Sequence, residues 1–140
     1  MRAGAAVAAV IAAALGACAQ PAASGSIVGR YTMHVTARDN PAWRGMVGDW
    51  NFEFTGDGRL FARQAGGKQM AIDMVYRVAG DILTIDDLRG NGSCRHFGVD
   101  AASARYRVRF VGAGFEARPL RDECTPRVYG MTLHGFERVR

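Results

Sequence analysis

The chain has 140 residues, of which 49% are hydrophobic, and its formal net charge at pH 7 is +5. Arginine carries almost all of the positive charge, because Lys68 is the single lysine, and arginine suits bidentate pairing with carboxylates and phosphates. No composition shift marks a second domain, and no internal repeat is visible, so the folded part is predicted to be one domain of ordinary size.

The N-terminal segment has the pattern of a secretory signal. A short basic start, Met1-Arg2, precedes an apolar run from Ala3 to Leu15, which is shorter than the roughly 20 residues needed to span a bilayer. The run ends in Leu15-Gly16-Ala17-Cys18, a sequence similar to a bacterial lipobox. Residues 1–17 are therefore predicted to be a lipoprotein signal peptide and Cys18 to be the lipidation site.

The predicted anchor fixes the expected location. Two acyl chains on Cys18 suffice for stable membrane attachment, and residues 18–26, rich in Ala and Ser, then form a flexible tether. We expect a cell-envelope protein that faces the periplasm or the extracytoplasmic side, with the lipid bilayer as a partner and no nucleic acid. The alternative is cleavage after Ala19, since Ala17-Cys18-Ala19 also fits the A-x-A rule, which would release a soluble periplasmic or secreted protein.

Two cysteines remain once Cys18 is set aside. In an oxidising compartment Cys94 and Cys124 are predicted to form a disulfide, which stabilises a small domain by about 3–4 kcal/mol across a loop of this length. A metal site of Cys94, His96 and Cys124 is the alternative, but it lacks the paired spacing of zinc sites. No metal and no cofactor are predicted.

From Ile27 onward, hydrophobic residues alternate with period two, and no stretch keeps helical spacing for three turns. Gly-rich turns separate the alternating runs. The predicted strands are 27–35, 50–54, 59–63, 70–78, 82–86, 105–110, 115–118 and about 131–139. Seven to nine short strands joined by tight turns predict an all-β fold for residues 27–140: a small antiparallel up-and-down barrel that closes by pairing its first and last strands.

Three short motifs resemble those of bacterial lipocalin-like (calycin-type) small lipoproteins, many of which have no assigned function. Gly29-Arg30-Tyr31 is similar to the lipocalin G-x-W signature, with Tyr in place of Trp. Asp122-x-Cys124-x-x-Arg127 and Phe136-Glu137-Arg138 are similar to the endings of such domains. The resemblance implies a lipocalin-like barrel in which Arg138 or Arg127 covers Tyr31 at the closed end.

The side chains predicted to face inward are mostly apolar, and methionine and aromatic residues adapt to irregular apolar guests. They predict a cavity for a small hydrophobic or amphipathic ligand, and the alternative is that they simply fill a narrow barrel. Trp43 falls in the loop where lipocalin-like barrels open, and it is expected to be a lid, to bind the membrane interface, or to be buried against the rim. The candidate lining residues are Tyr31, Met33, Trp50, Phe52, Met70, Ile72, Met74, Tyr76, Val108 and Phe110.

Four arginines are expected to share the outer side of one hairpin, and we call them the arginine face: Arg105, Arg107, Arg109 and Arg118. Such a face suits lipid headgroups or an acidic partner. The alternative is a lattice of ion pairs with Glu116 and other carboxylates.

No catalytic constellation is visible, so the protein is not expected to be an enzyme. No spacing typical of a catalytic or metal site joins the three histidines, His34, His96 and His134. Asp86-Asp87 is predicted to be a solvated pair at a strand end. A pocket that brought His96, Asp86 and Asp87 together would favour an enzyme instead. The sequence thus predicts a binding module, or alternatively an interaction or structural protein that acts through the arginine face.

Overall fold

The computed structural model describes residues 25–39, 41–66, 69–99 and 103–140, with the side chains of residues 41–43 excepted. The predicted signal peptide, Cys18 and the side chain of Trp43 lie outside the described residues. Within the described part of the chain, no helix is long and apolar enough to cross a membrane.

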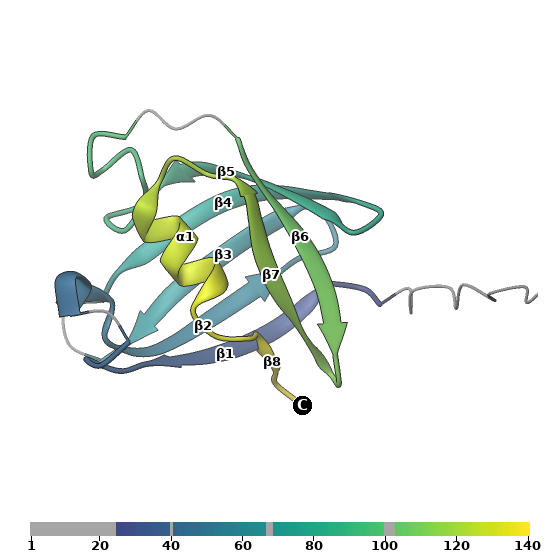
Figure 1. Cartoon of the computed structure of the whole chain (residues 1–140), viewed down its shortest axis with the longest axis horizontal. Coiled ribbons are helices and arrows are strands. Elements are labelled where there is room, and N and C mark those ends of the chain that lie inside the picture. Colours follow the sequence, from purple (N-terminus) through teal and green to yellow (C-terminus); the bar gives the residue numbers. More distant parts are fainter. Residues whose placement is uncertain (1–24, 40, 67–68, 100–102) are drawn as a thin grey trace, which may run out of the picture.

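Eight antiparallel strands form a single meander that curves into a nearly closed barrel, as predicted (Figure 1). Along the sheet the order is β7-β6-β5-β4-β3-β2-β1-β8. The elements are β1 Gly29–Val35, η1 Pro41–Met46, β2 Gly48–Phe54, β3 Arg59–Ala65, β4 Ala71–Ala79, β5 Ile82–Arg89, β6 Ala104–Val111, β7 Gly114–Arg121, α1 Thr125–Thr132 and β8 Glu137–Arg138.

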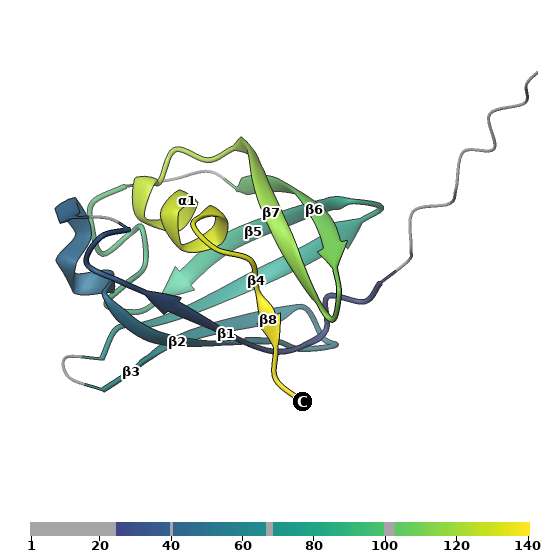
Figure 2. The same cartoon turned by 60° about the horizontal axis from the view of Figure 1, so that its bottom comes forward.

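The two ends of the barrel carry different elements. Figures 1 and 2 both place the short helices η1 and α1 at one end, while the first described residues lie at the other. We call the end with η1 and α1 the open end, and the opposite end, where the tight turns 55–58, 79–81 and 112–113 lie, the closed end.

The barrel closes through its last strand, as predicted. Tyr31 of β1 pairs with Arg138 of β8, and on the other side Phe115 of β7 and Phe136 form a two-way backbone bridge. The N···O distances of this bridge are 3.2 and 2.8 Å. The seam is short, because it consists of two residue pairs between β1 and β8 and one bridge between β7 and Phe136, so the barrel is nearly closed.

The last strand is much shorter than the predicted range 131–139, because α1 occupies 125–132. Pro126 lies in the first turn of α1, where a missing N–H costs nothing. The buried residues Arg127 and Met131 are four apart, so they share one helical face. A helix of two turns is too short for its periodicity to stand out against the surrounding strands.

The alternation of side chains along each strand determines which residues enter the core. The predicted inward sets of β1 and β2 are buried, with Tyr31 and Phe54 each 1% exposed. In β4 the pattern fails at two positions. Strict alternation along the strand would place Val78 inward, yet it is 45% exposed. Asp73, which would face outward, is buried between Arg63 and Arg89. The pairing of β4 with β5 shifts register between Asp73 and Met74, so simple alternation does not hold along this strand.

Candidate functional site

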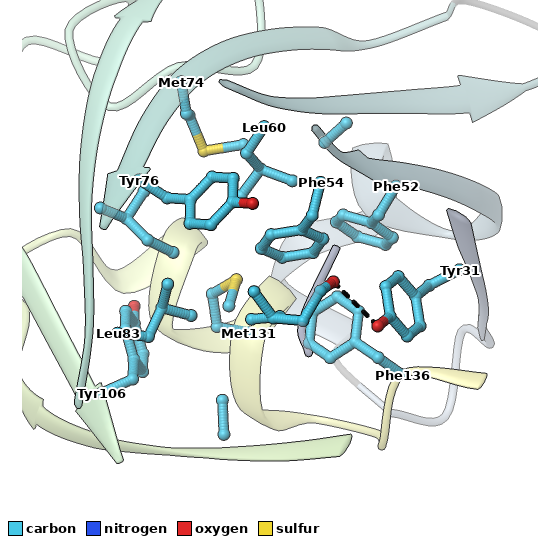
Figure 3. Packing of buried hydrophobic residues seen from close by; sticks show 14 of the residues in the cluster. Tyr31, Phe52, Phe54, Leu60, Met74, Tyr76, Leu83, Tyr106, Met131 and Phe136 are labelled. Carbon is cyan, nitrogen blue, oxygen red and sulfur yellow. Dashed lines mark hydrogen bonds between the residues drawn. The ribbon is translucent and has the colours of Figure 1, made fainter. Parts of the chain in front are cut away.

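The closed end is filled by aromatic rings. We call Tyr31, Phe54, Phe115 and Phe136 the closed-end cluster. Phe115 and Phe136 stack with ring centroids 4.5 Å apart, and Tyr31 meets Phe115 edge-on at 5.1 Å. Figure 3 shows Tyr31, Phe54 and Phe136 directed toward one another. Rings in such contacts add about 0.5–1.5 kcal/mol per pair beyond their burial, so this end of the barrel is a solid core.

Arg138 covers the closed-end cluster from outside. Its guanidinium lies 5.1 Å from the centre of the Tyr31 ring and donates a hydrogen bond of 2.8 Å to the Tyr31 hydroxyl. That hydroxyl in turn donates to the carbonyl of Ile27 at 2.9 Å. Burial raises the pKa of Tyr31, although Arg138 opposes the effect. Of the two arginines predicted to cover Tyr31, Arg138 holds this position and Arg127 lies elsewhere.

A pocket of about 40 Å³ lies at the open end. All five methionines of the described residues line it, so we call it the methionine pocket. Its wall is almost entirely apolar. The lining residues are Met33, Val35, Met46, Trp50, Phe52, Ala62, Met70, Ile72, Met74, Asp87, Gly92, Cys94, Pro126, Arg127, Gly130 and Met131.

Six of the ten predicted lining residues line the methionine pocket: Met33, Trp50, Phe52, Met70, Ile72 and Met74. The other four lie away from it. Tyr31 belongs to the closed-end cluster, and Tyr76 packs on Phe54 with ring centroids 5.1 Å apart. Val108 is buried in the core, while Phe110 is half-buried against the backbone of Gly25. Alternation identified inward side chains correctly here but did not show at which height along the barrel each one lies.

Gln64, which the sequence analysis did not single out, holds the mouth of the pocket. The Gln64 side chain donates to the carbonyls of Gly45 and Val47 and accepts from the amide of Met70. It therefore joins the β1–β2 connection, which carries Met46, to the β3–β4 hairpin, which carries Met70. A polar residue at an inward position of a strand is the sequence signal that marks Gln64.

Two glycines bring backbone close to the methionines. A Cβ added at Gly92 would lie 2.9 Å from Ile72 Cγ1 and 3.1 Å from Met70 Cε. A Cβ added at Gly130 of α1 would lie 3.5 Å from Met46 Cε, an ordinary contact. The space in the pocket therefore depends on the absence of side chains at these two positions.

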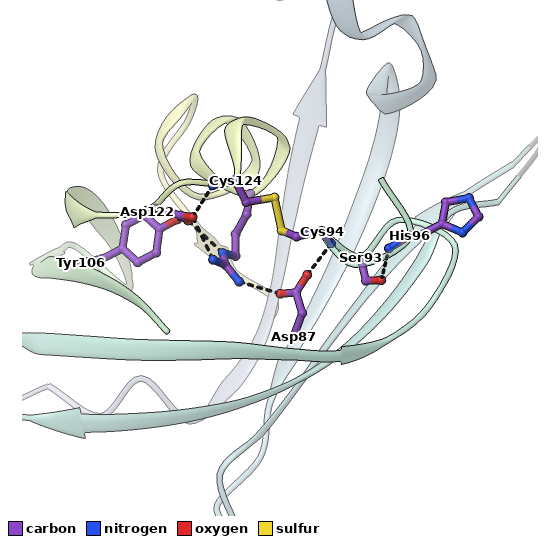
Figure 4. The surroundings of a disulfide bond; sticks show 8 residues. Asp87, Ser93, Cys94, His96, Tyr106, Asp122 and Cys124 are labelled. Atoms are coloured by element: carbon purple, nitrogen blue, oxygen red, sulfur yellow. Dashed lines mark hydrogen bonds and ion pairs between the residues drawn. A yellow bond between two sulfur atoms is a disulfide. The ribbon is translucent and has the colours of Figure 1, made fainter. Parts of the chain in front are cut away.

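Below the pocket lies a buried charged group that we call the Arg127 cluster, made of Arg127, Asp87, Asp122 and Tyr106. Arg127 donates to Asp87 at 3.0 Å and to both oxygens of Asp122 at 2.8 Å. The Tyr106 hydroxyl donates to Asp122 as well (Figure 4). Burial and the neighbouring Asp122 carboxylate raise the pKa of Tyr106, and the two aspartates keep Arg127 charged by raising its pKa despite burial.

The prediction of a solvated Asp86-Asp87 pair is wrong for Asp87. Asp87 is 7% exposed and accepts from Arg127 and from the amide of Cys94 at 2.6 Å. Asp86 lies on the other face of β5, and His96 is exposed. The three residues that would have favoured an enzyme therefore do not come together. The spacing Asp122-x-Cys124-x-x-Arg127 was the sequence signal for the cluster, since it places a carboxylate, a disulfide and a guanidinium around the start of α1.

The Cys94–Cys124 disulfide is present, with the two Cα atoms 5.9 Å apart. It joins the β5–β6 connection to the residue before α1 (Figure 4). The bridge therefore ties α1 over the open end, and Cys94 itself lines the pocket. No group of three or more His, Cys, Asp or Glu residues suited to a metal ion occurs among the residues that the structure describes.

The arginine face lies on the outer side of β6 and β7, and its four side chains are exposed. Arg109 pairs with Glu116 at 2.6 Å and Arg107 with Asp81 at 3.0 Å. Across the two strands, however, Arg107 lies opposite Arg118. Within the described residues Arg105 and Arg118 have no ion-pair partner, so the face is only partly neutralised.

Comparison with known proteins identifies no relative: no family model, no curated protein and no solved structure matches this chain.

Proposed function

We propose that the protein is a membrane-anchored envelope lipoprotein whose barrel binds a small apolar ligand in the methionine pocket. The observation that carries the proposal is that all five described methionines, together with Trp50 and Phe52, line a single pocket at the open end. Flexible thioether side chains accommodate irregular guests better than branched or aromatic ones do. The resemblance to lipocalin-like lipoproteins favours the same role.

The size of the pocket restricts the ligand. An apolar cavity that binds benzene measures about 150 Å³, whereas the methionine pocket measures about 40 Å³. A guest is therefore either very small or gains space as methionine side chains change rotamer. Most of the barrel is filled, so a long fatty chain along the barrel axis is not supported.

Native mass spectrometry of the protein purified from its own host tests the binding function. A bound species that leaves on denaturation supports the proposal and gives the mass of the ligand. A bare protein that also fails to bind a hydrophobic fluorophore contradicts it. Gly92→Ala provides a matched variant, because the added methyl group presses on Ile72 and Met70 and should abolish fluorophore binding.

The anchor has its own test. Cys18→Ser should abolish palmitate labelling and release the protein from the membrane fraction. Unchanged labelling would contradict lipidation at Cys18, and release by cleavage after Ala19 in the unsubstituted protein would support the soluble alternative.

A second function, contact of the arginine face with an anionic bilayer surface, is favoured by the position of the tether. The described chain begins at Gly25, which packs on Phe110 near the end of β6. Six residues lie between Cys18 and Gly25, and the seven steps from one Cα atom to the next reach at most about 25 Å. An anchored barrel therefore holds β6 and its arginines close to the lipid headgroups.

Vesicle co-sedimentation of the protein with Cys18→Ser, which lacks the anchor, measures this contact. Arg105→Ser with Arg118→Ser should weaken binding to phosphatidylglycerol vesicles, since each arginine near an anionic surface contributes about 1 kcal/mol. Arg30→Ser with Arg38→Ser, which removes two exposed arginines on and after β1, is the matched control. Equal effects of the two changes would show that net charge alone governs binding.

A further inference from the structure

The methionine pocket combines soft ligand atoms with an excess of buried negative charge. We propose that it binds one soft monovalent metal ion, Cu(I) or Ag(I), through methionine thioethers at its mouth, principally Met46 and Met70. The inference goes beyond the proposed apolar binding, because it assigns the same pocket a ligand of a different chemical class.

The clustering of methionine is the first observation. The five described methionines come from β1, η1, the β3–β4 hairpin and α1, yet all line one pocket. They are Met33, Met46, Met70, Met74 and Met131. Thioether sulfur is a soft, uncharged ligand that selects Cu(I), whereas Ca²⁺ and Mg²⁺ require oxygen ligands. Cys94 and Cys124 supply no thiolate, because they are joined in the disulfide.

The charge of the pocket floor is the second observation. Asp87 and Arg127 line the pocket, and Arg127 also pairs with Asp122. Two carboxylates against one guanidinium leave a formal charge of −1 beside an apolar space. In a region of low effective dielectric such a charge favours a monovalent cation and disfavours an anionic ligand such as a fatty acid.

Hydrogen bonds fix the backbone segments that carry Met46 and Met70 at the mouth of the pocket. Gln64 holds the backbone on both sides, next to Met46 and at the amide of Met70. Trp50 lines the same pocket, and its indole N–H donates to the carbonyl of Met46 at 2.8 Å. The face of an indole ring attracts a cation. Met46 and Met70 thus approach from different segments whose backbones are fixed, while their side chains keep the freedom to turn toward an ion.

The test is titration of the whole chain carrying Cys18→Ser with Ag(I), followed by native mass spectrometry and calorimetry. A thiol assay first establishes that the disulfide is intact, and no thiol reductant is used. One Ag(I) per chain is the expected result. X-ray absorption should then show sulfur neighbours of the metal, and the methionine variant below distinguishes thioethers from the disulfide sulfur that Cys94 brings to the pocket.

Met46→Leu with Met70→Leu is the decisive variant. Volume-conserving swaps of this kind cost less than about 1.5 kcal/mol in stability, so the fold is retained. Each lost ligand should weaken Ag(I) binding by at least about tenfold, the loss that even an outer-shell partner causes. The triple variant His34→Gln, His96→Gln and His134→Gln is the control and should keep full affinity. Unchanged affinity in the methionine variant, or loss in the histidine variant, would overturn the proposal.

The hydrophobic fluorophore separates this proposal from the proposed binding of an apolar ligand. Fluorophore binding without Ag(I) binding would overturn the metal site and leave an apolar pocket. Failure of both probes, together with a bare protein in native mass spectrometry, would overturn both proposals.

Discussion

The closed end and the open end of this barrel are built from different apolar side chains. At the closed end, Phe115 and Phe136 stack and Tyr31 is locked by Arg138, so rigid rings leave no space. At the open end, thioether side chains surround a pocket of about 40 Å³ beneath a helix held by a disulfide. The two regions are equally apolar but differ in stiffness, which separates the part that holds the barrel together from the part suited to binding.

Truncation of one buried side chain at each end should test this difference in stiffness most directly. Phe136→Ala at the closed end should lower the free energy of unfolding by about 3–5 kcal/mol, because four neighbouring rings surround the removed ring. Met46→Ala should cost about 2 kcal/mol, the low end for methionine, because flexible neighbours move into the space. Urea unfolding measures both values.

The exposed Leu120 provides the control for that pair, since Leu120→Ala should change stability by less than about 0.5 kcal/mol. Equal losses for Phe136→Ala and Met46→Ala would contradict the difference in stiffness between the two ends.

Removal of the disulfide should destabilise the open end of the barrel most. Cys94→Ala with Cys124→Ala should lower the free energy of unfolding by about 3–4 kcal/mol, because the unfolded chain regains the freedom that a 30-residue bridge removes. Hydrogen exchange measures where the change falls: amides of α1 should exchange faster than those of β1 and β2. Uniform acceleration across the barrel would show that the bridge does not act locally.

Tyr106→Phe should alter the alkaline limit of stability. Burial and Asp122 raise the pKa of Tyr106 above its usual 10.0, so the folded state retains this proton more tightly than the unfolded state. The resulting stability is fully present below pH 10 and is lost as pH rises above it.

The substitution should therefore flatten the decline of stability above pH 10, while costing about 1 kcal/mol at neutral pH through the lost hydrogen bond. Part of the decline should remain, since burial also raises the pKa of Tyr31 and Tyr76. Thermal unfolding at a series of pH values measures the effect, and an unchanged alkaline profile would contradict the role of Tyr106.

Gly130→Ala should have a small effect on stability, of the opposite sign to the substitutions above. Alanine favours a helix interior over glycine by up to about 1 kcal/mol, and the added methyl meets Met46 Cε at an ordinary 3.5 Å. The same methyl occupies space in the methionine pocket, so ligand binding should weaken while the melting temperature rises. A parallel fall of both quantities would indicate that the helix itself was disturbed.

Much of the barrel was predictable because alternation is a local property. The inward faces of β1 and β2 followed from period-two patterning. The tight turns followed from the Gly-rich segments, and the closure of the first strand on the last followed from the number of strands and the avoidance of open edges. The failures lie where neighbours overrule the pattern: at Asp73, which two arginines cover, and at α1, where Arg127 and Met131 share a face that two helical turns are too short to reveal.

The sequence by itself predicted the all-β class, seven to nine strands, the pairing of Cys94 with Cys124 and a set of inward apolar residues. Only the tertiary structure decided which of these residues meet. Tyr31 and Met33 are both inward on β1, yet one packs in the closed-end cluster and the other lines the methionine pocket. The physical reason is that alternation specifies the face of a strand, whereas height along the barrel depends on strand register and on the helix that covers one end.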